Sequence, residues 1–240
     1  WLPETLQKIS AALKNSKIPT KNIEIIIVDD GSSDNTKSII NDIAKDFLFN
    51  IKVIKQKNSG RYIARKNGVN AAKFKYIWFI DTRVHTDPHA LSYIKSELEK
   101  DKSAVIWNAH VYVQKSGNLI ARFMDAITCI GWRAYFSNPR RTSYGLKEFD
   151  KYPKGTTSFL APTYIIKSAI TEFDQESRDL RVSSDDTHLI RIMARDYKIN
   201  LSPKFSCIYH ARTTLGAFIR HSYHRGQVFV DGFYRWGVEG

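Results

Sequence analysis

The feature that most constrains the fold is a continuous β-branched run at 24–28 that ends in the acidic turn 29–34. A run of this length predicts a short strand that is buried on both faces within a parallel sheet. Apolar residues at helical spacing follow between 39 and 43, and either Asp34 or Asn35 is placed to cap that helix. Strand, turn and helix in this order indicate an α/β fold.

The strand, turn and helix unit recurs along the first half of the chain. Ligands of α/β sheets bind beyond the carboxyl ends of the strands, where Asp30 and Asp81 both lie. We therefore predict a mainly parallel central sheet flanked by helices, with a Rossmann-like nucleotide-binding half. The expected strands are 24–28, 51–54, 76–80 and 104–107, and the expected helices are 2–18, 63–72, 91–100 and one that contains Ile39.

The charge balance favours anionic partners. The 37 basic and 24 acidic side chains give a formal net charge of +13, which suits nucleotide diphosphates, nucleic acid or acidic lipid headgroups. The basic residues are dispersed rather than gathered with aromatic residues into a recognisable module, so we expect no nucleic-acid partner. Cys129 and Cys207 lack the spacing of a zinc site or a disulfide framework, which indicates the cytoplasm.

The chain reads as one domain. Composition shifts little along 1–240, so we expect no linker between its halves at 1–110 and 111–240. No apolar run approaches the roughly 20 residues that a membrane-spanning helix requires. The expected location is the cytoplasm, including the inner face of a membrane.

Two acidic turns carry candidate ligand-binding residues. Asp30 is fixed at a strand end, where a carboxylate can accept a hydrogen bond from a nucleotide base, and Gly31 lets the backbone turn close to a ligand. Capping of the next helix is the alternative role of this turn. In the second turn, Asp81 follows a strand and is separated by one residue from Arg83.

Two further segments carry candidates of opposite charge. Arg65 lies in the segment 58–68, after a glycine-containing turn, and its guanidinium offers forked donors to phosphate oxygens. A solvated arginine on a helix face is the alternative. Asp185 and Asp186 open a later helix, where Asp186 is placed to accept a proton or to cap the helix.

The segments 25–36, 58–68 and 78–85 resemble, in sequence and in order, the family 2 glycosyltransferases of the GT-A fold. The resemblance implies a nucleotide-sugar donor, whose base is bound by Asp30 and whose phosphates lie beside Arg65. It also implies that 1–110 is the nucleotide-sugar-binding half and 111–240 the acceptor-binding half. The family's first strand would lie before the start of this chain. We therefore expect a GT-A fold from which this strand is missing.

The third segment stands where the family has its DXD motif, whose carboxylates hold a divalent cation on the donor diphosphate. Arg83 replaces the second acid, so one oxygen ligand is lost and a positive charge stands near the cation. Two alternatives follow. Asp81 binds Mg²⁺ or Mn²⁺ with help from His85 or from His210, which the resemblance places at the cation or diphosphate site. Otherwise Arg83 itself neutralises the leaving diphosphate.

The acceptor side also resembles the family. The segments 155–167 and 170–174 match its acceptor-side strand and its Gly-Phe-Asp turn, and 183–189 matches its acidic pair at a helix start. The resemblance makes Asp186 the general base of an inverting transfer, with Asp185 on the acceptor or diphosphate side.

Basic and aromatic residues outside these motifs have two alternative roles each. Arg220 and Arg225 lie in a cluster suited to closing over a diphosphate or to meeting an anionic lipid surface, and a solvated helix face is the other possibility. The segment 120–136 is apolar at helical spacing. Its aromatic residues Trp132, Tyr135 and Phe136 either pack in the core or touch a sugar or lipid.

The expected function is inverting transfer of a hexose-type sugar from a nucleoside diphosphate, preferably uridine-based, to a glycan or polyprenyl-phosphate acceptor. We also expect peripheral contact with an anionic membrane. The non-enzymatic rival is a degenerate sugar-nucleotide or glycan-binding module, motivated by Arg83 in place of an acid. A nucleotidyltransferase is the enzymatic rival, although the glycine-rich phosphate loop that it usually needs is not found in the sequence.

Overall fold

The computed structural model describes residues 1–114, 118–176, 185–212, 214–220, 222, 223 and 226. The strands are β1 (Glu24–Asp30), β2 (Asn50–Gln56), β3 (Tyr76–Ile80), β4 (Val84–Thr86), β5 (Ile106–Val113), β6 (Thr142–Tyr144), β7 (Ser158–Pro162) and β8 (Ile199–Tyr209). The helices are α1 (Leu2–Ser16), α2 (Thr36–Asp46), α3 (Arg61–Ala71), α4 (Ala90–Lys100), α5 (Leu119–Gly131), α6 (Arg133–Phe136), α7 (Thr163–Glu176) and α8 (Asp185–Asp196). Short 3-10 helices lie at Thr20–Asn22 and Leu146–Lys151.

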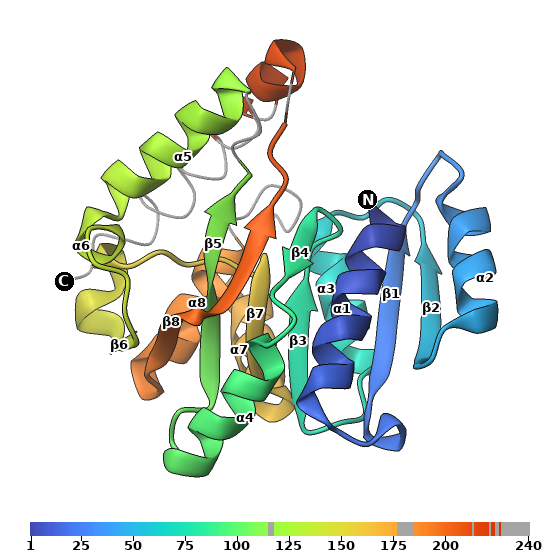
Figure 1. Ribbon diagram of the computed structural model, residues 1–240, viewed down its shortest axis with the longest axis horizontal. Helices are drawn as coiled ribbons and strands as arrows, with labels where there is room; N and C mark the ends of the chain where they lie inside the picture. Colours follow the sequence, from blue (N-terminus) through green and yellow to red (C-terminus); the bar gives the residue numbers. More distant parts are fainter. Residues whose placement is uncertain (115–117, 177–184, 213, 221, 224–225, 227–240) are drawn as a thin grey trace.

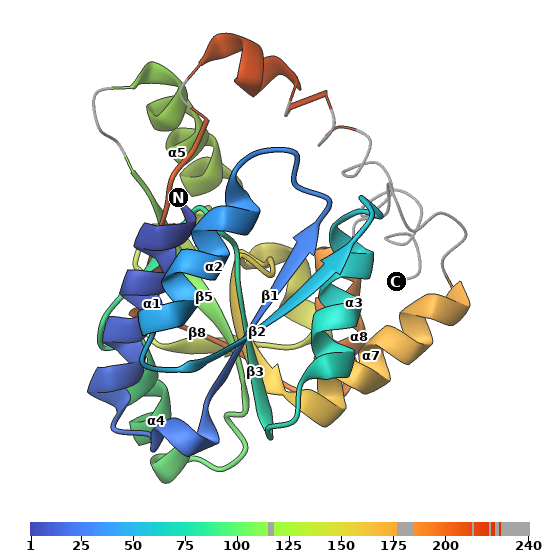
Figure 2. The ribbon, with the colours of Figure 1, turned by 90° about the vertical axis from the view of Figure 1, so that its right-hand side faces the viewer.

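The strands form two sheets between layers of helices. β1 and β2 make a parallel pair, and the other six strands form a sheet in the order β3-β7-β5-β8-β4, with β6 also paired to β8. Helices α1 and α4 cover one face, and α3, α7 and α8 cover the other (Figure 2). This arrangement confirms the predicted α/β class and the expected elements in the first half of the chain, to which the structure adds the short strand β4.

The central sheet is mixed rather than mainly parallel as expected. Among the described residues, the β1–β2 and β5–β8 pairs are parallel, whereas β7 runs antiparallel to both β3 and β5. Strands β4 and β6 also run antiparallel to β8. Apolar runs in the sequence predict strands but not their direction relative to their neighbours. The antiparallel position of β7 between β3 and β5 therefore could not be predicted from local sequence.

No backbone ladder joins β1 to β3, although every residue of both strands is described. Each strand therefore has an edge that is not hydrogen-bonded to the other. All seven residues of β1 and all five of β3 are only partly buried. The expectation that β1 is buried on both faces is wrong, because a strand without a neighbour on one side keeps part of its surface exposed.

The core consists of one apolar cluster on each face of the larger sheet. Alternate residues of a strand point to opposite faces, so Ile106 of β5 joins the cluster under α7 and α8 while Trp107 joins the cluster under α1 and α4. Both side chains are fully buried. Strand β5 thus contributes side chains to the apolar clusters on both faces of the larger sheet.

The turn predicted at 170–174 is helical in the structure and lies inside α7. The apolar residues Ile166, Ile170 and Phe173 recur at helical spacing and are buried in the core. The chain has Glu172 where the family pattern has glycine, so no residue suited to a turn interrupts this periodicity.

The segment from 120 to 136 forms α5 and α6, in agreement with its apolar periodicity. No helix among the described residues combines the length and apolar character needed to cross a bilayer.

Candidate active site

Arg65, on α3, joins the end of β3 to the start of α8. Its guanidinium donates to Oδ2 of Asp185, and its other terminal nitrogen lies 3.8 Å from Oδ1 of Asp81. Arg61, one turn earlier on α3, lies 4.0 Å from the second oxygen of Asp185. The amide of Asp81 donates to the carbonyl of Thr157 at 3.0 Å, just before β7. Acids predicted from two separate motifs therefore lie around one arginine.

Burial decides the electrostatics of this group. The side chains of Arg65 and Asp185 are 12% and 2% exposed, whereas that of Asp81 is 47% exposed. Burial alone would lower the pKa of Arg65, but Asp185, Asp81 and Asp186 outweigh it and raise that pKa. The guanidinium therefore remains charged. Although about half of the Asp81 side chain is exposed, its partial burial raises the pKa of its carboxyl group, with Arg65 opposing and Asp186 adding to the rise.

Asp185 is held inside the protein rather than presented to solvent. Burial raises the pKa of its carboxyl group, against the opposing charge of Arg65. Because its side chain is almost fully enclosed and is paired with Arg65, Asp185 orients that arginine. Its predicted contact with acceptor or diphosphate stays a prediction.

Asp186 follows Asp185 in the first turn of α8 and is partly exposed. Its Oδ1 accepts a hydrogen bond from the Thr187 amide at 2.9 Å, so the carboxylate meets part of the capping alternative. A Cβ added at Gly155 would lie 3.9 Å from Oδ2 of Asp186. That oxygen therefore faces the loop before β7, from which Thr157 also contacts Asp81. The predicted base lies beside the donor-side acid.

Asp30 organises the turn that leads into α3. Its Oδ1 accepts hydrogen bonds from the Ser59 amide at 2.8 Å and the Gln56 side chain at 2.7 Å. Its Oδ2 accepts from the Gly60 amide at 3.0 Å. These contacts fix the start of the helix that carries Arg65, a positioning role that the sequence did not reveal. The predicted contact with a nucleotide base stays a prediction.

Gly31 allows this turn to close against the neighbouring loop. Its φ of +76° lies in the left-handed region, and a Cβ at this position would lie 2.7 Å from the backbone nitrogen of Asn58. Only glycine avoids both penalties. In the same turn the carboxylate of Asp29 accepts from the Ser32 amide, and that of Asp34 accepts from the Thr36 amide near the start of α2.

Arg83 and His210 belong to a cluster against the start of α1. The guanidinium of Arg83 lies 5.2 Å from the Trp1 ring, and its Nη1 lies 3.5 Å from the carbonyl of His210. Nε2 of His210 lies 2.9 Å from Nδ1 of His85, whose Nε2 lies 3.5 Å from Glu4. The two histidines predicted as alternative ligands therefore contact each other, and Arg83 contacts an aromatic ring.

The two imidazoles share a preference for the neutral form. Burial lowers the pKa of His85, with Glu4 opposing, and burial together with His85 lowers the pKa of His210. Across the described residues, no three His, Cys, Asp or Glu side chains gather in a way that could hold a metal ion. Asp81 is the exposed carboxylate at this end of β3.

The basic and aromatic candidates lie elsewhere. Arg220 is exposed on the short helix 215–220, which lies beside α5 and apart from α3 and α8 in both views (Figures 1 and 2). Arg225 lies outside the described residues. Tyr135 is buried in the core with its hydroxyl 3.0 Å from Nδ1 of His110, and Trp132 lies 4.3 Å from Nζ of Lys154. Core packing accounts for Tyr135, whereas Trp132 is partly exposed and contacts Lys154.

Residues that the motifs did not identify complete the group. Arg61 adds a second cation, while Thr157 contributes only a backbone carbonyl, which no side-chain pattern can reveal. Asp174, expected in a turn, instead accepts hydrogen bonds from Tyr62 and Lys66 and pins α3 to α7.

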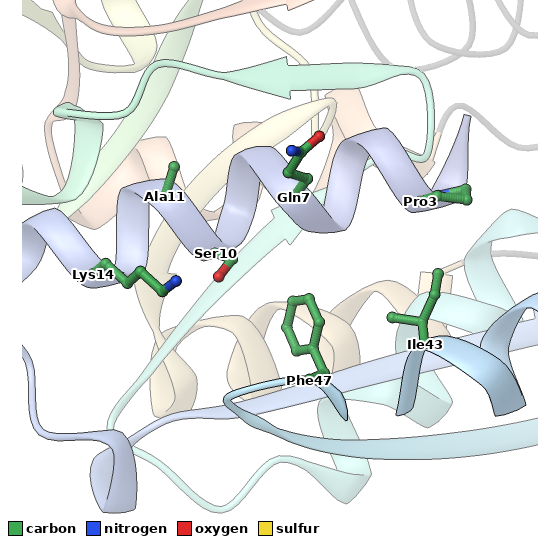
Figure 3. A pocket seen from close by; sticks show the side chains of 7 residues that line it. All are labelled: Pro3, Gln7, Ser10, Ala11, Lys14, Ile43 and Phe47. Carbon is green, nitrogen blue, oxygen red and sulfur yellow. The ribbon is translucent and has the colours of Figure 1, made fainter. Parts of the chain in front are cut away.

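A cavity of about 350 Å³ lies away from this group, between one side of α1 and the residues Ile43 and Phe47 at the end of α2 (Figure 3). No acid or histidine is among its lining residues. The cavity therefore contains none of the acids or histidines of the candidate site and does not form that site.

An α/β sheet with acids at its strand ends, facing an acidic pair at a helix start, defines the GT-A class of nucleotide-sugar transferases. The family model described as "Glycosyl transferase family 2" matches residues 1–168. The chain belongs to this family.

Known proteins agree with this assignment. Poly-beta-1,6-N-acetyl-D-glucosamine synthase of Staphylococcus epidermidis is 23% identical over 218 residues, which are 89% of this chain and 48% of the synthase. Glycosyltransferase GlyG of Streptococcus pneumoniae is 34% identical over 103 residues, 41% of this chain and 33% of GlyG. The match thus spans about half the length of the synthase and about a third of the length of GlyG.

Two solved structures share the fold. S. aureus TarS 1–349 in complex with UDP-GlcNAc superposes with a TM-score of 0.63 at 14% identity, covering 89% of this chain and 56% of that one. Mannosyltransferase PcManGT from Pyrobaculum calidifontis, in complex with GDP-Man and Mn²⁺, superposes with a TM-score of 0.66 at 14% identity. That match covers all of this chain and 62% of PcManGT. The GT-A fold predicted from the sequence is confirmed.

Proposed function

We propose that this chain is the catalytic domain of an inverting glycosyltransferase that moves a hexose-type sugar from a nucleoside diphosphate to an acceptor hydroxyl. The observation that carries the proposal is the position of Arg65 between Asp81 and Asp185. It brings the donor-side end of β3 next to the helix start that carries Asp186. The carboxylate of Asp186 therefore belongs to the group of charges at which donor and acceptor would meet.

In the proposed reaction, Asp186 accepts the proton of the acceptor hydroxyl as the acceptor oxygen bonds to the anomeric carbon. The bond from that carbon to the diphosphate oxygen breaks on the opposite face, which inverts the configuration. The raised pKa of Arg65 supports a permanent positive charge near the leaving group. Arg61, whose side chain is 55% exposed, supplies a second cation that solvent and ligand can reach.

Donor identity is proposed by similarity. TarS is described in complex with UDP-GlcNAc and PcManGT in complex with GDP-Man, so a nucleoside diphosphate sugar is the donor class, and we favour a uridine diphosphate sugar. In this proposal Asp30 accepts a hydrogen bond from the base, and Arg65 and Arg83 serve the diphosphate.

A divalent cation remains part of the proposal as an altered site. Asp81 and His210 are the residues that would hold Mg²⁺ or Mn²⁺, which would neutralise the donor diphosphate. Support comes from the exposed carboxylate of Asp81, since magnesium often takes only one or two protein carboxylates beside substrate phosphates. His210 contacts His85 rather than a further acid, so we derive no step through the cation.

The proposed acceptor is a glycan or a polyprenyl phosphate, met at an anionic membrane surface. The net charge of +13 supports such a surface contact. We place the contact on the cytoplasmic side, because only two cysteines occur in the sequence, as is usual in reducing compartments.

The decisive experiment measures donor binding and turnover together. Uridine and guanosine diphosphate sugars are screened for thermal stabilisation and for hydrolysis or transfer, with magnesium, manganese or chelator, on the full-length protein. We expect a uridine diphosphate sugar to stabilise the protein. Asp186→Asn should lower turnover by at least about a hundredfold, the usual contribution of a general base, and leave donor affinity within about twofold.

Asp196→Asn is the matched control, because it makes the same change at the exposed far end of α8. Turnover of this variant should equal that of the parent. If Asp186→Asn instead abolishes donor binding, Asp186 supports the structure and is not the base. Donor binding without any turnover, with or without manganese, would favour the sugar-nucleotide-binding module that Arg83 suggests.

A further inference from the structure

Helix α5 carries its apolar side chains on the face that points away from the protein. Leu119, Phe123, Ile127 and Ile130 recur at spacings of three and four residues, so they lie on one side of the helix. Their exposed fractions are 78%, 52%, 50% and 71%. The opposite side of α5 packs near β5, where Ala121 is buried. A surface helix normally shows the reverse arrangement.

A second apolar stripe continues this face. Leu215 and Ile219 lie on the helix beside α5 and Tyr223 follows that helix; the three are spaced four residues apart and are 64%, 57% and 74% exposed. The rings of Phe123 and Phe218 meet edge to face at 5.9 Å, which joins the two segments. Figures 1 and 2 both show the helix 215–220 beside α5. We call these seven exposed apolar residues the α5 surface.

Cations border the α5 surface. Arg122 is exposed on α5, Arg133 is exposed at the start of α6, and Arg220 is exposed on the neighbouring helix. The only acid within α5, Asp125, is partly buried. A continuous apolar stripe with arginines at its border matches the chemistry of a bilayer surface, whose acyl region accepts apolar side chains below anionic headgroups.

A second copy of this chain fits the surface less well. In a two-fold dimer each copy would bring the same arginines to the same contact, and each chain carries a formal charge of +13. Like charges would face each other around the apolar stripe, which opposes self-association. An anionic lipid surface carries the complementary charge.

We propose that the α5 surface docks the protein on an anionic membrane, with the side chains of Leu119, Phe123, Ile127 and Ile130 inserted among the lipids. This inference rests on the membrane contact of the proposed function and identifies the residues that make it. Helix α5 lies at the side of the larger sheet where β5 and β8 end (Figure 1). His210 directly follows β8, so the docked face lies at the sheet edge that carries candidate site residues.

The test is sedimentation of the full-length protein with vesicles of phosphatidylcholine alone or mixed with phosphatidylglycerol. The parent should bind the mixed vesicles, and binding should fall as salt is added. The double variant Leu119→Asp and Ile130→Asp should bind at least about tenfold more weakly, because charges would replace inserted apolar groups. Arg122→Gln should bind about fivefold more weakly through loss of one cation near the lipid.

Leu48→Asp is the matched control. It changes a leucine that is 57% exposed between α2 and β2, at the far side of the molecule from α5 (Figure 1). This variant should bind vesicles like the parent. A second measurement avoids variants altogether: hydrogen exchange of the parent should slow in α5 when mixed vesicles are added.

Several outcomes would overturn the proposal. Equal vesicle binding by the parent and the double variant would remove the α5 surface from the contact. A dimer that dissociates in the double variant, without vesicle binding by the parent, would assign the surface to a second copy. Thermal stabilisation by nucleotide sugars tests donor binding separately, so loss of docking and loss of the proposed enzymatic function are distinguishable.

Discussion

Arg65 and Asp185, separated by 120 positions in the sequence, form an ion pair that connects α3 to α8. Asp185→Asn would remove the carboxylate that pairs directly with the buried guanidinium and leave Asp81, at 3.8 Å, and Asp186 as the nearby acids. Because an uncompensated buried charge is costly, we expect the free energy of unfolding to fall by about 3 kcal/mol, measured by urea denaturation.

Glu172→Gln is the control for this prediction. It breaks the pair between Arg195 and Glu172, whose side chains are 44% and 34% exposed. Solvent screens such a pair, so its loss should cost less than about 1 kcal/mol. Equal effects of the two variants would contradict a special role for the buried pair.

Gly31→Ala should destabilise the turn that follows β1. The new Cβ would meet the backbone of Asn58 at 2.7 Å, and the φ of +76° would strain any residue with a side chain. We expect a loss of about 2 kcal/mol in unfolding free energy and weaker nucleotide affinity, measured by denaturation and calorimetry. Gly131→Ala, where nothing lies within 4 Å of the new Cβ, should change stability by less than about 0.5 kcal/mol.

Arg83→Asp would place a second acid two residues after Asp81. The substitution removes a cation and adds an oxygen ligand, so we expect manganese to bind at least tenfold more tightly, measured by titration calorimetry. Lys167→Asp makes the same charge change at an exposed position of α7 and should leave manganese affinity unaltered. Unchanged manganese affinity in Arg83→Asp would show that position 83 does not control a cation site.

Acid should destabilise the protein through His110. Burial lowers the pKa of this imidazole from 6.5 to about 4. Below pH 6.5 the unfolded chain binds a proton that the folded protein excludes, so stability falls as pH decreases and levels off near pH 4. The loss is at most about 3 kcal/mol for this group.

Melting temperatures between pH 7 and 4.5 test this prediction by comparison of the parent with His110→Gln. The variant should lose less stability on acidification than the parent does. His89→Gln, at an exposed position before α4, should retain the slope of the parent. A slope that His110→Gln leaves unaltered would assign the acid sensitivity to other groups.

The sequence predicted the elements better than their pairing. Strand 76–80 has the bounds expected from its sequence, because an apolar run of five residues followed by an aspartate has few other structures. The antiparallel insertion of β7 depends on contacts between residues about 80 positions apart, which local periodicity does not encode.

The candidate site shows the same division. Motif positions identified Asp81, Arg65 and Asp186 as functional candidates, and the structure brings them together. The hydrogen bonds that occupy both oxygens of Asp30 come from Gln56, Ser59 and Gly60, so they depend on the folded turn rather than on a motif. The sequence also did not predict that the apolar face of α5 is exposed, because apolar spacing predicts an amphipathic helix but not which of its faces packs against the protein.

The missing ladder between β1 and β3 leaves a seam through the molecule. On one side lies the turn of Asp30, and on the other lie Asp81 and the start of α8. Side chains rather than sheet hydrogen bonds hold the two halves in register, with α3 packed on β1 and also against α7. A nucleotide sugar that contacts both sides would therefore stabilise the packing of the two halves, at the place where no sheet hydrogen bonds join them.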